Sequence, residues 1–160
     1  MAYDMNEGEA LEALARATPQ WLAGFFDGEG CICSRNNTQR LPNITVSIEQ
    51  AEPKVIAVIA FKFNFRIIEH EVRGRKYFGV CMGGRSALPF LKVIKDYVIC
   101  KRRQVEAAIE LLSLVQDKSD SRATVKEDII MRREELAKII RESNGAVNRV
   151  EVINGVDRDT

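Results

Sequence analysis

The sequence of 160 residues has little of several features that mark particular classes of protein. It has one histidine, His70, and its four cysteines lack the C-x-x-C pairs typical of zinc sites and the framework of a disulfide-rich domain. The longest wholly apolar run, Val55 to Phe61, has seven residues, whereas a membrane-spanning helix needs about 20. The acidic start also lacks the basic region of a signal peptide. We therefore expect a soluble, intracellular protein with reduced thiols and no membrane partner.

The composition is that of an ordinary globular protein. Apolar residues make up 46% of the chain and charged residues 29%, which excludes collagen, a disordered tail and a bare coiled coil. A chain of this length can bury a core of its own. We expect one domain over residues 1–160.

The net charge of +1 conceals a strongly uneven distribution. Residues 62–103 carry eleven basic against three acidic side chains, whereas residues 1–30 carry one basic against six acidic. A basic stretch of this kind is often only a solvated face, but it is also typical of a site for a polyanion such as nucleic acid.

The periodicity predicts an α+β domain with an αββαββα core, in which helices pack on one face of a four-stranded antiparallel sheet. Further helices are expected at both ends. The expected elements are a short N-terminal helix from about residue 6, a helix over 19–26 that Thr18 and Pro19 open, strands over 31–35 and 43–49, a helix over 54–63, strands over 66–72 and 76–82, a helix that Ser86 caps, and a helix over 101–116. Thr124 and Glu127 have the spacing of a capping box, which predicts a last helix over about 124–143.

Each predicted hairpin has one polar and one apolar face. In the first, Ile44, Val46 and Ile48 alternate with polar residues. The polar residues there are Asn43, Thr45 and Ser47. In the second, we expect the odd positions to form one polar face, comprising Glu69, Glu71, Arg73, Arg75 and Tyr77.

The segment Leu22 to Gly30 is the most informative in the chain. Ala23 and Gly24 are small residues inside a helix, where a glycine costs about 1 kcal/mol relative to alanine, and close approach of another backbone would offset that cost. Asp27 and Glu29 lie near the negative end of the helix dipole, where a bound cation would stabilise them. The alternative is a turn with solvated acids.

This segment resembles the nine-residue signature of LAGLIDADG homing endonucleases, and the order of elements over about residues 19–116 is similar to the same family. Phe25, Phe26 and Gly28 are mild departures from the signature, and Glu29 replaces the usual Asp. The resemblance implies a site-specific endonuclease that binds double-stranded DNA and hydrolyses both strands with a divalent metal, most simply Mg²⁺.

The resemblance also implies an active site. Glu29 and the backbone carbonyl of Gly28 would bind the metal, Gln50 would order the attacking water, and Lys101 would lie beside the scissile phosphate. Lys101 has independent support, because cations at a helix N-terminus are unfavourable, and this placement therefore suggests that a bound anion compensates them. Lys54 is a weaker candidate for a phosphate contact, since it could equally be a solvated surface lysine.

The polar sheet face would read bases in the major groove. The residues implied for DNA binding are Arg35, Asn37, Gln39, Arg40, Asn43, Thr45 and Ser47 in the first hairpin; Glu69, Glu71, Arg73, Arg75 and Tyr77 in the second; and Lys54 and Arg103 elsewhere.

One copy of the signature implies a homodimer, because each of the two DNA strands needs a Glu29 of its own. The two chains would meet through Trp21, Ala23, Gly24 and Phe25 on a pseudo-palindromic site. The alternatives are an intron maturase or a DNA-binding regulator that does not cleave, and a structural protein of the same fold. The family occurs in organelles, prokaryotes and phages, so the compartment is expected to be one of these.

Overall fold

The computed structural model describes residues 7–37, 40–116 and 120–147. The α+β class that the sequence predicts is confirmed. In chain order the elements are α1 (Glu7–Arg16), α2 (Pro19–Glu29), β1 (Gly30–Asn37), β2 (Arg40–Gln50), α3 (Pro53–Phe63), β3 (Ile67–Val72), β4 (Arg75–Gly83), the 3₁₀ helix η1 (Gly84–Ala87), α4 (Leu88–Ile94), α5 (Arg102–Ser113) and α6 (Glu127–Val147). Among the described helices, none is both long and apolar enough to cross a lipid bilayer.

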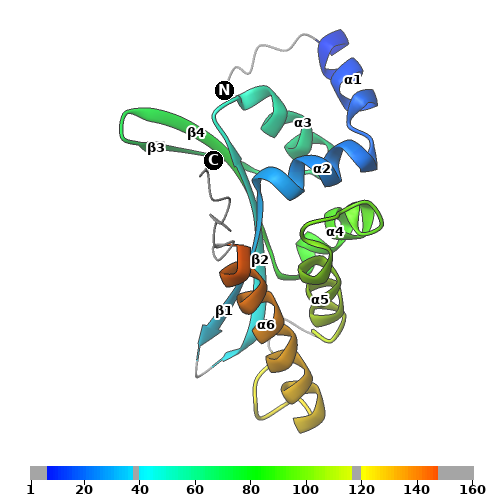
Figure 1. The fold of residues 1–160 in the computed structure, drawn as a ribbon, viewed down its shortest axis with the longest axis vertical. Coiled ribbons are helices and arrows are strands. Elements are labelled where there is room, and N and C mark those ends of the chain that lie inside the picture. Colours follow the sequence, from blue (N-terminus) through cyan, green and yellow to red (C-terminus); the bar gives the residue numbers. More distant parts are fainter. Residues whose placement is uncertain (1–6, 38–39, 117–119, 148–160) are drawn as a thin grey trace, which may run out of the picture.

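The four strands form one antiparallel sheet in the order β1-β2-β4-β3. Figure 1 shows this sheet nearly edge-on, with α2, α3, α4 and α5 along one side of it. Helix α6 packs against α5 and against the β1–β2 hairpin. The helices therefore form one layer and the sheet the other.

The core lies between these layers because the strands alternate as the sequence predicts. Ile44, Val46 and Ile48 are at most 2% exposed and pack with Val80 and Met82 beneath the helices. The side chains that point the other way are exposed or half-buried. We call this second surface the open face, and strand pairing gives it Cys31, Cys33, Asn43, Thr45, Ser47, Glu49, Ile68, His70, Val72, Arg75, Tyr77, Gly79 and Cys81.

The second hairpin corrects one prediction. Arg73 and Gly74 form a two-residue turn with φ angles of 52° and 77°, and Val72 pairs directly with Arg75 across it. Paired residues point to the same side of a sheet, so the parity of the face changes across such a turn. The expectation that Glu69, Glu71, Arg75 and Tyr77 share one face is therefore wrong.

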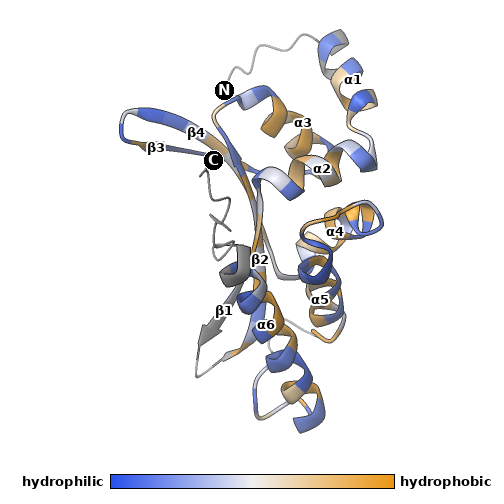
Figure 2. Cartoon of the chain, in the orientation of Figure 1, coloured by the Kyte–Doolittle hydropathy of each residue, from blue (hydrophilic) through white to orange (hydrophobic). Residues whose placement is uncertain are grey.

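Glu69 and Glu71 instead pair with Phe78 and Lys76 and point to the side opposite the open face. The carboxylate of Glu69 makes an ion pair with the Lys76 ammonium at 2.7 Å. Both acids remain exposed, because the hairpin extends beyond the helical layer, and Figures 1 and 2 show this hydrophilic extension. Arg75 and Tyr77 lie on the open face.

Two helix starts also differ from the prediction. The Ser86 hydroxyl donates to the Gly83 carbonyl at 2.8 Å, inside η1, and α4 begins only at Leu88. The hydroxyl of Thr124 accepts from the Ser121 amide at 3.0 Å, so it closes a turn rather than capping α6. Helix α6 begins at Glu127 and ends at Val147, beyond the end near residue 143 that the sequence predicts.

Candidate active site and nucleic-acid interface

Helix α2 places the two acids of the signature at its last turn. It begins as predicted, with the Thr18 hydroxyl accepting from the Trp21 amide at 3.2 Å and Pro19 in the first turn. The helix continues through Glu29, and the Gly30 amide donates to the Phe26 carbonyl. Strand β1 starts at once, so the exposed Glu29 stands where the helix meets the sheet.

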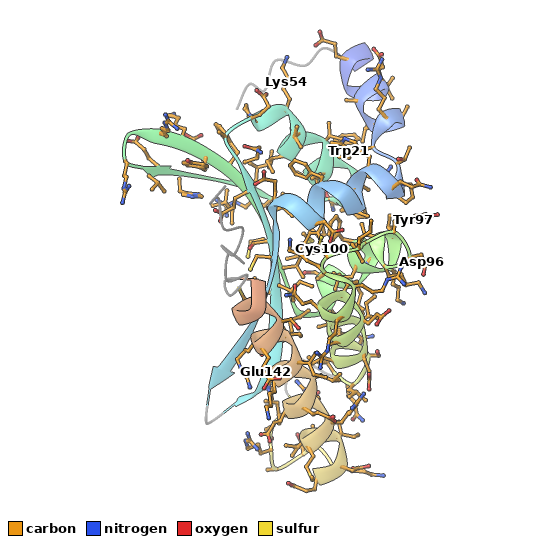
Figure 3. All side chains as sticks on the ribbon, viewed as in Figure 1. Trp21, Lys54, Asp96, Tyr97, Cys100 and Glu142 are labelled. Carbon is orange, nitrogen blue, oxygen red and sulfur yellow. The ribbon has the colours of Figure 1, made fainter. Side chains whose placement is uncertain are left out.

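The Asp27 carboxylate binds the chain just before α5. One oxygen accepts from the amides of Ile99 at 2.7 Å and Cys100 at 3.2 Å, and the other accepts from the Lys101 amide at 3.0 Å. Figure 3 shows Cys100 on this connection, close to α2. We expected a bound anion to compensate the start of α5, but the Asp27 carboxylate of the chain itself occupies this position, so the cationic helix start no longer argues for a bound phosphate.

Lys101 is brought to the same corner. Its ammonium donates to the backbone carbonyl of Asp27 and lies 5.9 Å from the centre of the Phe26 ring. A cation at the carboxyl end of a helix is favourable, because the last carbonyls of the helix carry partial negative charge. The structure therefore places the half-buried Lys101 at the turn that carries Gly28 and Glu29.

Gln50 ends β2 near this turn. Gly30, the first residue of β1, pairs with Ile48, so the end of β2 runs alongside the end of α2. The half-buried Gln50 side chain accepts from the Ala51 amide at 2.7 Å. The three residues implied as catalytic thus come from three elements that meet at one corner of the sheet.

The oxygen atoms at this corner suit a hard divalent cation. Mg²⁺ and Ca²⁺ prefer carboxylate and carbonyl oxygens, and the last carbonyls of a helix have no partner within the helix. Glu29 and Gly28 supply one of each. Among the described residues, no three His, Cys, Asp or Glu side chains cluster into a metal site.

A thiol pair follows Glu29 on β1. The sulfur atoms of Cys31 and Cys33 lie 3.4 Å apart. Burial, followed by the hydrogen bond with Cys33, raises the pKa of the Cys31 thiol to about 11. Cys31 is therefore a neutral thiol at physiological pH.

The structure places the implied DNA-binding residues unevenly. Asn43, Thr45 and Ser47 share the open face, as predicted. Arg73 lies in the hairpin turn, and Arg103 is exposed in the first turn of α5. Gln39 lies outside the described residues, as do the side chains of Arg35, Asn37 and Arg40.

Lys54 lies in the first turn of α3 and lines a cavity of about 420 Å³ between α1, α2 and α3. Trp21, which Figure 3 labels with Lys54, lines the same cavity. That Lys54 contacts a DNA phosphate thus remains a prediction.

The predicted dimer face is partly corrected. Trp21 is 39% exposed and stacks on Phe25 with 5.4 Å between ring centres. Gly24 is exposed, and a Cβ added there would have no heavy atom within 4 Å. Ala23 is fully buried in the chain's own core, so its assignment to an interface is wrong. We call Trp21, Gly24 and Phe25 the α2 stripe.

The sequence analysis did not identify Glu49 and His70 as residues of the open face. The Nε2 atom of His70 lies 3.6 Å from the carboxylate of Glu49, and the His70 ring stacks on Tyr77. The sequence contains one signal for this cluster, because His70 lies between Glu69 and Glu71 and so belongs to the other face of the strand.

Comparisons with known proteins place this fold. No family model matches the chain, and no curated protein resembles it in sequence. Among solved structures, the archaeal intron-encoded homing endonuclease I-Vdi141I, complexed with DNA, superimposes with a TM-score of 0.63 at 19% identity over 78% of this chain and 82% of its own. The homing endonuclease I-CvuI, in complex with its target in the presence of Ca, gives a TM-score of 0.61 at 17% identity over 83% and 84%.

A third similar structure is longer. The LAGLIDADG homing endonuclease I-SmaMI, bound to cleaved DNA, gives a TM-score of 0.59 at 16% identity and matches 83% of this chain but only 48% of its own. The chain therefore has the fold of LAGLIDADG homing endonucleases, as the resemblance predicted.

Proposed function

We propose that this protein is a homing endonuclease that cuts both strands of a long DNA site by metal-dependent phosphodiester hydrolysis. The observation that carries the proposal is that the elements bearing Glu29, Gln50 and Lys101 meet at one corner of the sheet. Asn43, Thr45, Ser47, Arg75 and Tyr77 add polar side chains on the open face, a broad sheet surface that suits the major groove. The DNA complexes of proteins with this fold support the same assignment.

The active form in this proposal is a homodimer. I-SmaMI is about twice the length that this chain matches, so one such chain has room for two units of this kind. The α2 stripe offers exposed aromatic rings beside a glycine whose Cβ position is open. Pairing two stripes about a twofold axis would bring both Glu29 carboxylates near that axis and match a pseudo-palindromic site.

Each residue at the corner has a distinct role in the proposed reaction. Glu29 and the Gly28 carbonyl would hold a divalent cation, which when bound lowers the pKa of water and stabilises charge on phosphate oxygens. Gln50 would orient the attacking water, and the Lys101 ammonium would face the negative charge that develops on the phosphate. The reaction needs no covalent enzyme intermediate.

The DNA contacts divide into two kinds. Asn43, Thr45, Ser47, Arg75 and Tyr77 on the open face would read base edges, with arginine suited to guanine and asparagine to adenine. Arg103 would contact phosphates, which fixes position without reading sequence. Glu69 and Glu71 point away from this face, which keeps their charge off the DNA.

The test uses purified protein, a library of candidate double-stranded DNA sites and Mg²⁺. The proposal expects double-strand cleavage that stops when a chelator removes the metal. Binding without cleavage would support a maturase or regulator instead, and neither binding nor cleavage would leave only a structural role. Sequencing the DNA around the reading frame would supply the target, since an intron or intein boundary marks it.

A further inference from the structure

Three strands of the open face bring one acid, one imidazole and one phenol together. Glu49 lies near the end of β2, His70 on β3 and Tyr77 on β4, and His70 pairs directly with Tyr77. The two rings stack with centres 5.9 Å apart and planes 18° apart. The carboxylate of Glu49 lies 3.6 Å from His70 Nε2.

Gly79 allows this arrangement. It pairs with Glu49 and stands between β2 and β3 in the strand order. A Cβ at position 79 would lie 3.0 Å from Cγ of Glu49, closer than ordinary van der Waals contact. The missing side chain leaves room for the Glu49 arm to cross β4 and reach His70.

The cluster is open to a ligand. The Glu49 side chain is 57% exposed and the His70 side chain 37% exposed. An exposed contact of this kind between a carboxylate and an imidazole contributes little to stability, so folding alone gives no strong reason for it. On a face that meets DNA, however, a carboxylate held in one direction has a specific use, because it can accept hydrogen bonds but cannot donate them.

We propose that Glu49, held in place by His70, selects an amino-bearing base at one position of each DNA half-site. In the major groove cytosine and adenine present an amino group, whereas guanine and thymine present carbonyl oxygens that a carboxylate repels. Cytosine is the preferred partner, since acidic side chains accept from its N4 amino group. His70 is a positioning residue, and its ring is itself fixed by the Tyr77 stack.

The position in the site follows from the strand. Glu49 directly precedes Gln50 and lies next to the junction of α2 and β1, where Glu29 stands. The selected base therefore lies in the inner part of the half-site, near the scissile phosphate. This inference rests on the proposed function, because it requires DNA on the open face.

The experiment selects a randomised double-stranded DNA library with wild-type protein and with Glu49→Gln, in Ca²⁺ buffer, and then sequences the bound DNA. We expect the wild type to prefer amino-bearing over carbonyl-bearing bases at one inner position by about 5- to 150-fold. Glu49→Gln, whose amide both donates and accepts, should reduce this preference to within about twofold while the other positions keep theirs.

Two further variants separate positioning from general effects. His70→Phe keeps a ring on Tyr77 but removes the contact with Glu49, so it should weaken the preference at the same position only. Glu69→Gln is the matched control, because it removes a carboxylate in an ion pair on the opposite side of the same hairpin. It should leave the whole profile unchanged, and thermal melting should show that all three variants fold.

The outcomes separate the two proposals. An unchanged profile for Glu49→Gln, or an equal loss at every position, would overturn the role of Glu49 while leaving the endonuclease proposal intact. If the wild type enriches no sequence at all, the DNA-binding function itself fails, and the assignment of Glu49 fails with it.

Discussion

Asp27 and Lys101 hold each other through two hydrogen bonds that run in the same direction. The Lys101 amide donates to the Asp27 carboxylate at 3.0 Å, and the Lys101 ammonium donates to the Asp27 backbone carbonyl. Asp27 thus fixes both the backbone and the side chain of Lys101, the proposed catalytic lysine. Helix α2 and the start of α5, which lie far apart in the sequence, are thereby joined at the corner where we propose the active site.

Asp27→Asn should destabilise the protein by about 1 to 2 kcal/mol, because an amide cannot accept three backbone hydrogen bonds as a carboxylate does. Urea unfolding measures this loss. Asp96→Asn is the matched control, since Asp96 is exposed on the same connection and has no hydrogen bond or ion pair with a described residue. Equal stability of the two variants would contradict the capping role of Asp27.

Gly24→Leu should give a folded monomer. The position is open within one chain, so the new side chain meets nothing there, but it would separate two α2 stripes packed against each other. Sedimentation measures the oligomeric state, and Lys138→Leu on α6 adds the same side chain to a different surface as a control. A dimer that survives Gly24→Leu would remove the α2 stripe from the interface.

Arg103→Ala and Arg75→Ala should affect DNA binding in different ways. Arg103 is exposed at the start of α5, so its loss should weaken binding to all sequences alike and reduce the salt dependence by about one unit of slope. Arg75 lies on the open face, so its loss should relax preference at one base pair of each half-site by about 1 to 3 kcal/mol. Competition binding over all single-base variants measures both. A uniform loss from Arg75→Ala would show that Arg75 contacts only phosphate.

The Cys31 thiol should resist alkylation at neutral pH. Its pKa is raised to about 11, so at pH 8 only about one thiol in a thousand is ionised, and the thiolate is the reactive form. Iodoacetamide should label the exposed Cys81 and Cys100 first, and the rate at Cys31 should rise about tenfold per pH unit towards pH 11. Peptide mass spectrometry measures each rate. Labelling of Cys31 as fast as Cys100 at pH 8 would show that its thiol is not buried.

The sequence predicts the fold well because its strongest signals are local. Alternation in Ile44, Val46 and Ile48 places β2, and Thr18 with Pro19 places the start of α2. The errors arise where the structure depends on backbone geometry or on contacts between distant residues. In the second hairpin, two turn residues with positive φ place the even positions of β3 on the same face as the odd positions of β4. The polar sequence of that hairpin has no hydrophobic pattern from which this change could be predicted.

The site shows the same division. The motif itself marks Glu29, and the cationic helix start suggested a bound anion beside Lys101. The folded chain shows that Asp27, more than 70 residues away in the sequence, supplies a carboxylate to this helix start instead. Ala23 was assigned to an interface because it is small, whereas its size is explained by burial in the chain's own core. Small residues in a helix indicate close packing, but they do not indicate against which partner.

The most direct test of the account is the activity of Glu29→Gln, which nearly keeps the shape of the side chain and removes its charge. The variant is compared with wild type on a cleavable DNA site in Mg²⁺, with nicking and double-strand cleavage followed on gels and binding measured in Ca²⁺. The account predicts that cleavage of both strands is abolished while DNA affinity stays within a few fold of wild type. Nicking by the variant at the wild-type rate would contradict the assignment of Glu29 as the metal-binding acid.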